Sequence, residues 1–102
     1  METETSTMKR LLQRIRVPQH LSGFRYLCVI IPKFEVGKKL CGDDGIYGLI
    51  GKAEKTTWRN IERRVHFAIG QSDKQGTRPL VVIAELREQF EREREEFLNE
   101  TP

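Results

Sequence analysis

The chain has 102 residues, which is enough for one domain with a single hydrophobic core. Its 18 Lys and Arg residues exceed its 15 Asp and Glu residues, for a net charge of +3. The longest apolar run, residues 27–31, stops at Pro32 and is too short to cross a bilayer, so we expect no membrane partner.

Charge is unevenly distributed along the chain. Residues 1–78 hold 15 basic and 8 acidic side chains, a balance of +7, whereas residues 79–102 hold 3 basic and 7 acidic ones, a balance of −4. The positive charge of residues 1–78 favours a polyanionic binding partner. The acidic residues 79–102 are expected to have a different role.

The first seven residues are polar and acidic, which is unlike a secretory signal. We therefore expect residues 1–7 to form a disordered tail of a cytoplasmic protein. In that compartment the two cysteines, Cys28 and Cys41, are expected as reduced thiols, although their spacing alone permits a disulfide.

Two helices are predicted in the first third of the chain. The first runs from about Thr7, a candidate N-cap, to Arg16, because apolar residues recur there at helical spacing. The second runs over about residues 23–31, with Ser22 as a candidate cap. Pro32 is expected to end or kink it, because proline lacks the backbone N–H and clashes with the preceding turn.

The segment 46–69 is the most informative part of the chain. It predicts two short helices around a tight turn, and the hydroxyl of Thr57 can cap the second. A polar loop at 70–76 separates it from a last helix that opens near Pro79, since proline in a first turn needs no donor, and runs to about Asn99.

No strand-like alternation persists, so the predicted fold class is all-α, with about five helices. Residues 8–78 are expected to form a helix-turn-helix domain, and residues 79–102 a long C-terminal helix. A helix-turn-helix places its second helix in the DNA major groove.

The helix after Thr57 is amphipathic when its residues are placed about 100° apart. The expected core stripe is Trp58, Ile61, Val65, Ala68 and Ile69. The opposite face offers side chains that hydrogen-bond base edges, and the helix start offers groups that bind phosphate. The predicted DNA contacts are Lys55, Thr56, Thr57, Arg59, Asn60, Glu62, Arg63 and His66. A solvated amphipathic helix explains the same pattern equally well.

A resemblance to a known family favours DNA binding. The residues that carry it are Val17-Pro18, His20-Leu21, Gly23-Phe24, Tyr26-Leu27, Ile46, Tyr47, Ile50, Thr56, Thr57, Ile61, Glu62, Arg63, Val65, Ala68 and Ile69. Over roughly residues 8–70, the chain resembles the DNA-binding effector domain of the sporulation master response regulators of endospore-forming bacteria. No segment resembles their receiver domain, so we expect a stand-alone effector domain that phosphorylation does not switch.

The resemblance implies that Glu62 and Arg63 contact bases, and that the protein is a nucleoid-associated transcription regulator that binds double-stranded DNA. Asn60 and His66 stand where the family has arginines, which implies an altered base preference or a lower affinity. Phe67 replaces a histidine on the outer face and indicates a protein contact. The alternative hypothesis is therefore a non-catalytic interaction module that modulates a related DNA-binding regulator.

The predicted last helix carries a narrow apolar stripe. Ile83, Phe90 and Phe97 recur every seven residues with Leu86 between them, a spacing typical of a helix–helix seam. We expect the first half of the helix to pack on the core and the stripe to mediate a homodimer, weakened where Glu93 interrupts it. A terminal helix that only frays is the alternative.

No pattern typical of an enzyme is present. His20 and His66 lie far apart without a Cys or carboxylate at metal-ligand spacing, and no oxyanion-forming glycine turn accompanies either cysteine. We expect no catalysis, no cofactor and no metal.

Overall fold

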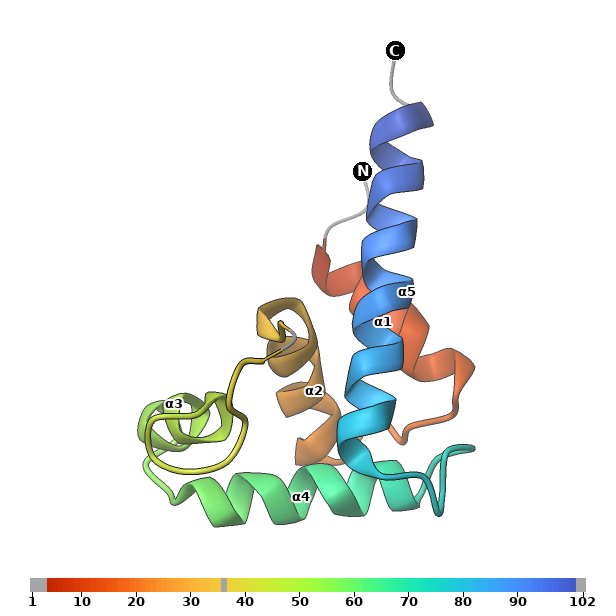
Figure 1. Cartoon of the computed structure of the whole chain (residues 1–102). Coiled ribbons are helices and arrows are strands. Elements are labelled where there is room, and N and C mark those ends of the chain that lie inside the picture. The colour runs from red at the N-terminus through yellow and green to blue at the C-terminus, as the bar shows by residue number, and fades with distance from the viewer. Residues whose placement is uncertain (1–3, 36, 101–102) are drawn as a thin grey trace.

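A computed structural model describes the backbone of residues 4–35 and 37–100 and the side chains of residues 5–35 and 37–96. This part of the chain forms five helices and no strand, so the prediction of an all-α fold is confirmed. The helices are α1 (Glu4–Arg14), α2 (Ser22–Lys33), α3 (Ile46–Ala53), α4 (Trp58–Gly70) and α5 (Pro79–Glu100) (Figure 1).

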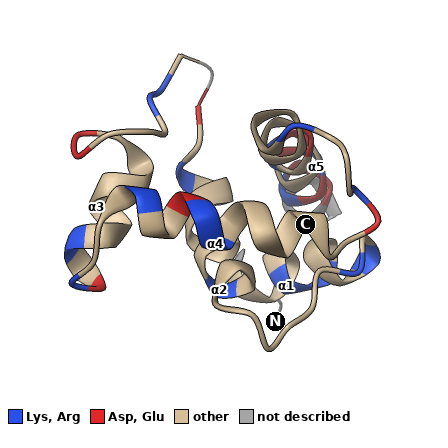
Figure 2. Cartoon of the chain, turned by 90° about the horizontal axis from the view of Figure 1, so that it is seen from below, with Lys and Arg blue, Asp and Glu red and all other residues tan. Residues whose placement is uncertain are grey.

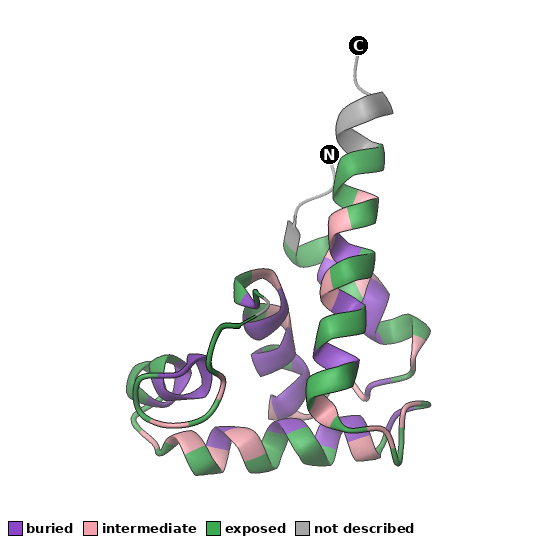
Figure 3. Ribbon diagram, in the orientation of Figure 1, coloured by how far each residue is buried: buried purple, intermediate pink, exposed green. Residues whose placement is uncertain are grey.

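Helix α2 is the centre of the packing, because it contacts each of the other four helices. Helix α4 lies across the base of the molecule, and α5 rises from near the end of α4 and extends past the body (Figure 1). All five helices contribute buried apolar side chains to one core, and the outer side of α4 and the upper part of α5 remain exposed (Figure 3). None of the described helices combines the length and the apolar character needed to cross a bilayer.

The first helix begins earlier and ends sooner than predicted. It starts at Glu4, so the expected disordered tail is wrong for residues 4–7, and residues 1–3 lie outside the described part. Its end is a Schellman motif in which the backbone N–H of Val17 donates to the Leu12 carbonyl at 3.0 Å. This motif requires Arg16 to adopt a left-handed backbone with φ of 60°, and it therefore stops the helix before Pro18 does.

Helix α2 begins without the predicted cap. The N-cap position is Leu21, no side chain caps the helix, and the Ser22 hydroxyl instead accepts a hydrogen bond from Arg64 at 3.0 Å. Gly23 lies where α2 crosses α4: a Cβ there would lie 2.3 Å from the Arg64 carbonyl oxygen and 2.6 Å from the Ala68 Cβ. Only glycine allows the two helices to approach this closely.

The other end of α2 depends on α5. Pro32 lies in the last turn, close to where the sequence predicts the end of this helix, and the final carbonyls of a helix have no partner within it. The Arg87 side chain of α5 donates to the Pro32 carbonyl oxygen at 2.5 Å and also lies 3.5 Å from that of Ile31. A cation at this position also complements the negative end of the helix dipole.

The predicted dimer seam on α5 is wrong for the three residues whose side chains are described. Ile83, Leu86 and Phe90 are at most 2% exposed, because they pack into the core of the same chain as α5 crosses α1 and α2. They are therefore unavailable to a second copy. The side chain of Phe97 lies outside the described residues. The expectation that the first half of this helix packs on the core is confirmed.

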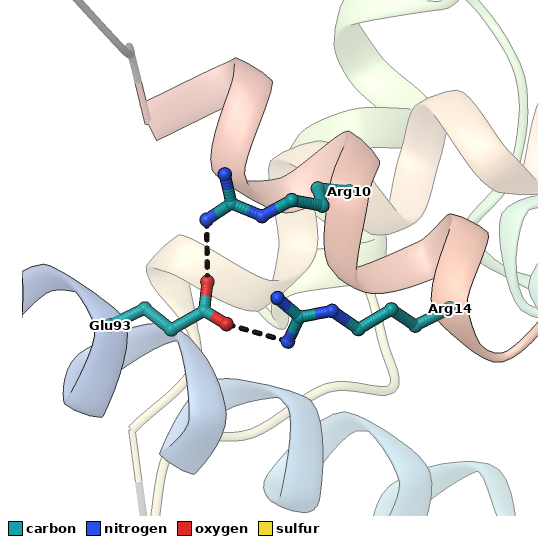
Figure 4. Close-up of polar contacts among 3 residues, drawn as sticks. All are labelled: Arg10, Arg14 and Glu93. Atoms are coloured by element: carbon teal, nitrogen blue, oxygen red, sulfur yellow. Dashed lines mark hydrogen bonds and ion pairs between the residues drawn. The ribbon is translucent and has the colours of Figure 1, made fainter.

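Glu93, which interrupts the apolar stripe, joins α5 to α1. Its two carboxylate oxygens accept hydrogen bonds from Arg10 at 2.8 Å and from Arg14 at 2.6 Å (Figure 4). Burial raises the pKa of the Glu93 carboxyl, but the hydrogen bonds and positive charges of the two arginines outweigh it, and the net pKa is below its ordinary value. The two arginines are one helical turn apart, so a single carboxylate reaches both.

We predict that Glu93 stabilises the fold in a pH-dependent way. Because its pKa is lower in the folded protein than in the unfolded chain, the stabilisation is complete above the ordinary pKa of 4.5 and disappears as the pH falls through the folded pKa. Glu93→Gln should therefore lower the free energy of unfolding at neutral pH, with a difference from wild type that shrinks below pH 4.5. Urea denaturation at a series of pH values measures this.

A matched control is Glu88→Gln, which removes an exposed ion pair with Arg92 on the same helix. Exposed pairs contribute little, so we expect a change of less than about 1 kcal/mol. If the Glu93→Gln difference stays constant from neutral to acidic pH, the side chain acts through packing and not through charge.

Candidate nucleic-acid interface

The turn between α3 and α4 is built from a second Schellman motif. The backbone N–H of Thr56 donates to the Gly51 carbonyl at 2.8 Å, and Lys55 adopts a left-handed backbone with φ of 58°. Thr57 then caps α4, because its hydroxyl accepts a hydrogen bond from the backbone N–H of Asn60 at 3.2 Å. The predicted cap is confirmed.

Lys55 combines a strained backbone with a charge, and substitutions separate the two. Lys55→Gly should raise the free energy of unfolding by about 0.5–1 kcal/mol, since a left-handed backbone costs other residues more than the entropy lost by glycine. If Lys55 also contacts a phosphate, the same variant should bind DNA more weakly and lower the salt slope by about 1. Urea denaturation and DNA titrations at several salt concentrations measure the two effects.

Two further variants separate the effect of the Lys55 backbone from the effect of its charge. Lys55→Ala should reproduce the weaker DNA binding without the gain in stability. Arg16→Gly relieves the same left-handed backbone at the end of α1, so it should stabilise the protein and leave DNA affinity unchanged. A Lys55→Gly variant with unaltered DNA binding would remove Lys55 from the interface.

Helix α4 presents the predicted face to solvent. Ile61, Val65, Ala68 and Ile69 are buried, and Trp58 is half-buried against the core, so the predicted core stripe is confirmed. Seen from below, α4 carries blue bands from its arginines and a single red band from Glu62 (Figure 2). At about 100° per residue, Arg63 projects directly away from this core, with Arg59 and Phe67 on either side of it.

Arg59, Arg63 and Phe67 lie at the centre of this face. The Arg59 guanidinium lies 5.3 Å from the centroid of the Trp58 ring, in a cation–π contact that holds it at the start of the helix. Phe67 is 56% exposed, so it presents a large apolar ring to solvent on the same face as Arg63.

Two predicted base contacts are engaged within the protein. The Asn60 side-chain amide donates to the Thr56 hydroxyl at 3.0 Å, so it supports the turn. Glu62 accepts a hydrogen bond from the Cys41 thiol at 3.0 Å, and this bond, followed by burial, raises the pKa of Cys41. Both side chains are therefore less available to a base edge than the sequence suggested.

The predicted site residues fall on three parts of the surface. Lys55, Thr56 and Thr57 lie at the turn, and Arg59 and Arg63 lie on the outer face of α4. His66 lines a separate groove beside Glu62. The turn and the two arginines thus lie on one continuous surface. Glu62 and His66 instead face the loop before α3.

Arg64 is a basic residue that the sequence reasoning did not place in the interface. It lies beside the first turn of α2, and a groove of about 410 Å³ is lined there by Leu21, Ser22, Gly23, Asn60, Arg63, Arg64 and Phe67. Arg64 and Ser22 are 42 positions apart in sequence, and their hydrogen bond forms because α2 crosses α4. Helical periodicity alone therefore could not predict the position of Arg64.

The cations of this face have no ion-pair partner among the described residues, and Lys9, Lys33, Lys38 and Arg78 share this property elsewhere on the surface. Among the described residues, a carboxylate lies within 4.0 Å of Arg10, Arg14, Arg16, Arg25, Lys39, Lys74, Arg87 and Arg92. Lys52, Lys55, Arg59 and Arg63 are exposed and have no such partner among the described residues. The α3–turn–α4 unit, residues 46–70, thus carries a net positive charge, with five basic and two acidic side chains.

Comparison of the chain with protein-family models, with curated proteins and with solved structures gives no significant match. Both cysteines are free thiols. No three His, Cys, Asp or Glu side chains of the described residues lie close enough together to hold a metal ion.

Proposed function

We propose that this protein binds double-stranded DNA in a sequence-specific manner and regulates transcription, with α4 in the major groove. The observation that carries the proposal is the set of four cations without an ion-pair partner among the described residues, Lys52, Lys55, Arg59 and Arg63, across α3, the turn and α4. A major groove admits one helix, and phosphates flank it on both sides. The motif resemblance to sporulation effector domains agrees with this proposal.

Each basic residue has a distinct role in the proposed complex. Arg63 projects most directly away from the core and reads a base edge, and the bidentate contact to guanine is the commonest specific arginine contact. Lys55 and the Thr56 hydroxyl bind a phosphate at the start of α4, where backbone amides and the helix dipole attract anions. Arg64 lies beside the uncapped N-terminus of α2, and together they bind a second phosphate.

A mobility-shift selection from random duplex pools tests the proposal. We expect an enriched sequence whose affinity falls steeply with salt, because each neutralised phosphate contributes a slope of about −0.9. The selected duplex should bind at least about a thousandfold more tightly than unrelated DNA of the same length. Absence of any duplex binding at low salt would contradict the proposal.

The second candidate function is a protein-interaction module, and Phe67 is the observation that favours it. A phenylalanine that is 56% exposed on the outer face of α4 is better suited to an apolar surface than to the edge of a base pair. If the duplex selection yields nothing, Phe67→Ser should abolish contact with the related regulator while Arg63→Ala does not.

A further inference from the structure

A second groove lies on the opposite flank of α4 from Arg64. Its walls are the loop residues 38–41, the middle of α4 and the beginning of α5. These three segments are distant in sequence, and all of them line the groove. The groove has a volume of about 470 Å³, which is large enough to hold several side chains.

The surface of this groove is mainly apolar. Its apolar lining residues are Leu40, Tyr47, Pro79 and Leu80. Tyr47 is 1% exposed, and burial raises the pKa of its phenol, so its ring is an uncharged part of the floor. Leu80 is 54% exposed and the adjacent Val81 is 43% exposed, so apolar surface continues out of the groove along α5.

Cations surround this apolar surface. Lys38, Lys39 and Arg78 line the groove, against one carboxylate, Glu62. Glu62 is already hydrogen-bonded by the Cys41 thiol, and Lys39 pairs with Asp44 at 3.0 Å. Lys38 and Arg78 have no carboxylate within 4.0 Å in the described part of the chain. The groove therefore has a positive rim and favours a negatively charged occupant.

We propose that this groove docks an acidic segment of a partner protein that carries one or two large apolar side chains. The acidic side chains complement Lys38 and Arg78, and the apolar ones cover Leu40 and Leu80. A nucleic acid would meet the cations but would leave the leucines exposed to water. A peptide also fits the open shape, because it can extend from the groove onto Val81.

The groove includes Glu62 and His66, two of the DNA contacts predicted from the sequence, but none of the four cations on which the DNA-binding proposal rests. Glu62 and Arg63 project about 100° apart around the axis of α4, so a peptide beside Glu62 leaves the outward side of Arg63 accessible. The docking proposal therefore stands whether or not the protein binds DNA.

Fluorescence anisotropy with the full chain tests the proposal. The probes are fluorescein-labelled peptides of about twelve residues, with Leu and Phe among Asp and Glu at helical or extended spacings. Two control sets carry Ser in place of Leu and Phe, or Lys in place of Asp and Glu. We expect members of the acidic–apolar set to bind and both control sets to bind at least about tenfold more weakly.

Variants of the groove locate the binding. Leu80→Asp and Arg78→Glu should each weaken the peptide complex by about tenfold or more. Both place a negative charge at the start of α5, where the helix dipole favours it, so the fold should be retained, and thermal unfolding checks this. Leu49→Asp is the matched control, because Leu49 is 57% exposed on α3 and lies outside the groove, and it should bind as wild type does.

Arg63→Ala should also leave peptide binding unchanged, which separates this groove from the DNA face. The proposal is overturned if no acidic–apolar peptide binds at about millimolar concentration. It is equally overturned if the lysine peptides bind as well as the acidic ones, or if Leu80→Asp has no more effect than Leu49→Asp.

Discussion

Arg63→Ala should weaken binding to the selected duplex by about 1–3 kcal/mol, which is the discrimination that one bidentate base contact provides. The loss should fall on one base pair, because Arg63 is the side chain of α4 that projects most directly away from the core. Repeating the duplex selection with the variant would reveal relaxed preference at that position. Affinity for unrelated DNA should change far less.

The matched variants distinguish base contact from general electrostatics. Arg14→Ala removes an arginine that is tied to Glu93 on a different helix, so it should leave DNA affinity and specificity unchanged. Arg63→Lys keeps the charge but loses the planar fork, and it should retain non-specific affinity while losing base preference. Equal binding of wild type and Arg63→Ala to every duplex would exclude α4 as a reading helix in the proposed orientation.

Gly23→Ala should lower the free energy of unfolding by about 1–3 kcal/mol or more, which is the typical cost of overpacking a core. The new methyl group would lie 2.3 Å from the Arg64 carbonyl oxygen, so α2 and α4 must move apart. A backbone atom cannot rotate away as a flexible side chain does. Urea denaturation with a measured midpoint gives the change directly.

Gly70→Ala is the control for the residue type. A Cβ at Gly70 would meet no atom within 4 Å, and the substitution removes the entropy of a glycine at the end of α4. The free energy of unfolding should stay the same or rise by at most about 1 kcal/mol. If both alanine variants behave alike, the close crossing of α2 and α4 does not determine stability.

Local patterns predicted much of this fold. The limits of α4, its Thr57 cap and its buried stripe follow from a capping hydroxyl followed by apolar residues at helical spacing, and all three are confirmed. The start of α5 at Pro79 follows from the same kind of rule. These features depend only on neighbours within a few positions, which a sequence displays directly.

Features that depend on distant segments could not be predicted in this way. The spacing of Ile83, Leu86 and Phe90 is the same whether the stripe faces a second chain or its own core, and only the crossing of α5 over α1 and α2 decides between them. Glu93 looked like a flaw in that stripe because its two partners lie 79 and 83 positions away. In the candidate site, the hydrogen bond from Cys41 to Glu62 could not be predicted either, because the two residues are 21 positions apart.

The contact between Arg87 and the end of α2 has a consequence for how the protein is made. A ribosome releases α2 long before it releases residue 87, and synthesis proceeds at about 5–20 residues per second. Until then the final carbonyls of α2 lack their arginine, and the apolar side chains that α5 covers face water. The nascent chain therefore completes the packing of α2 only when α5 has emerged, and a message truncated before α5 yields a chain that cellular proteases can recognise.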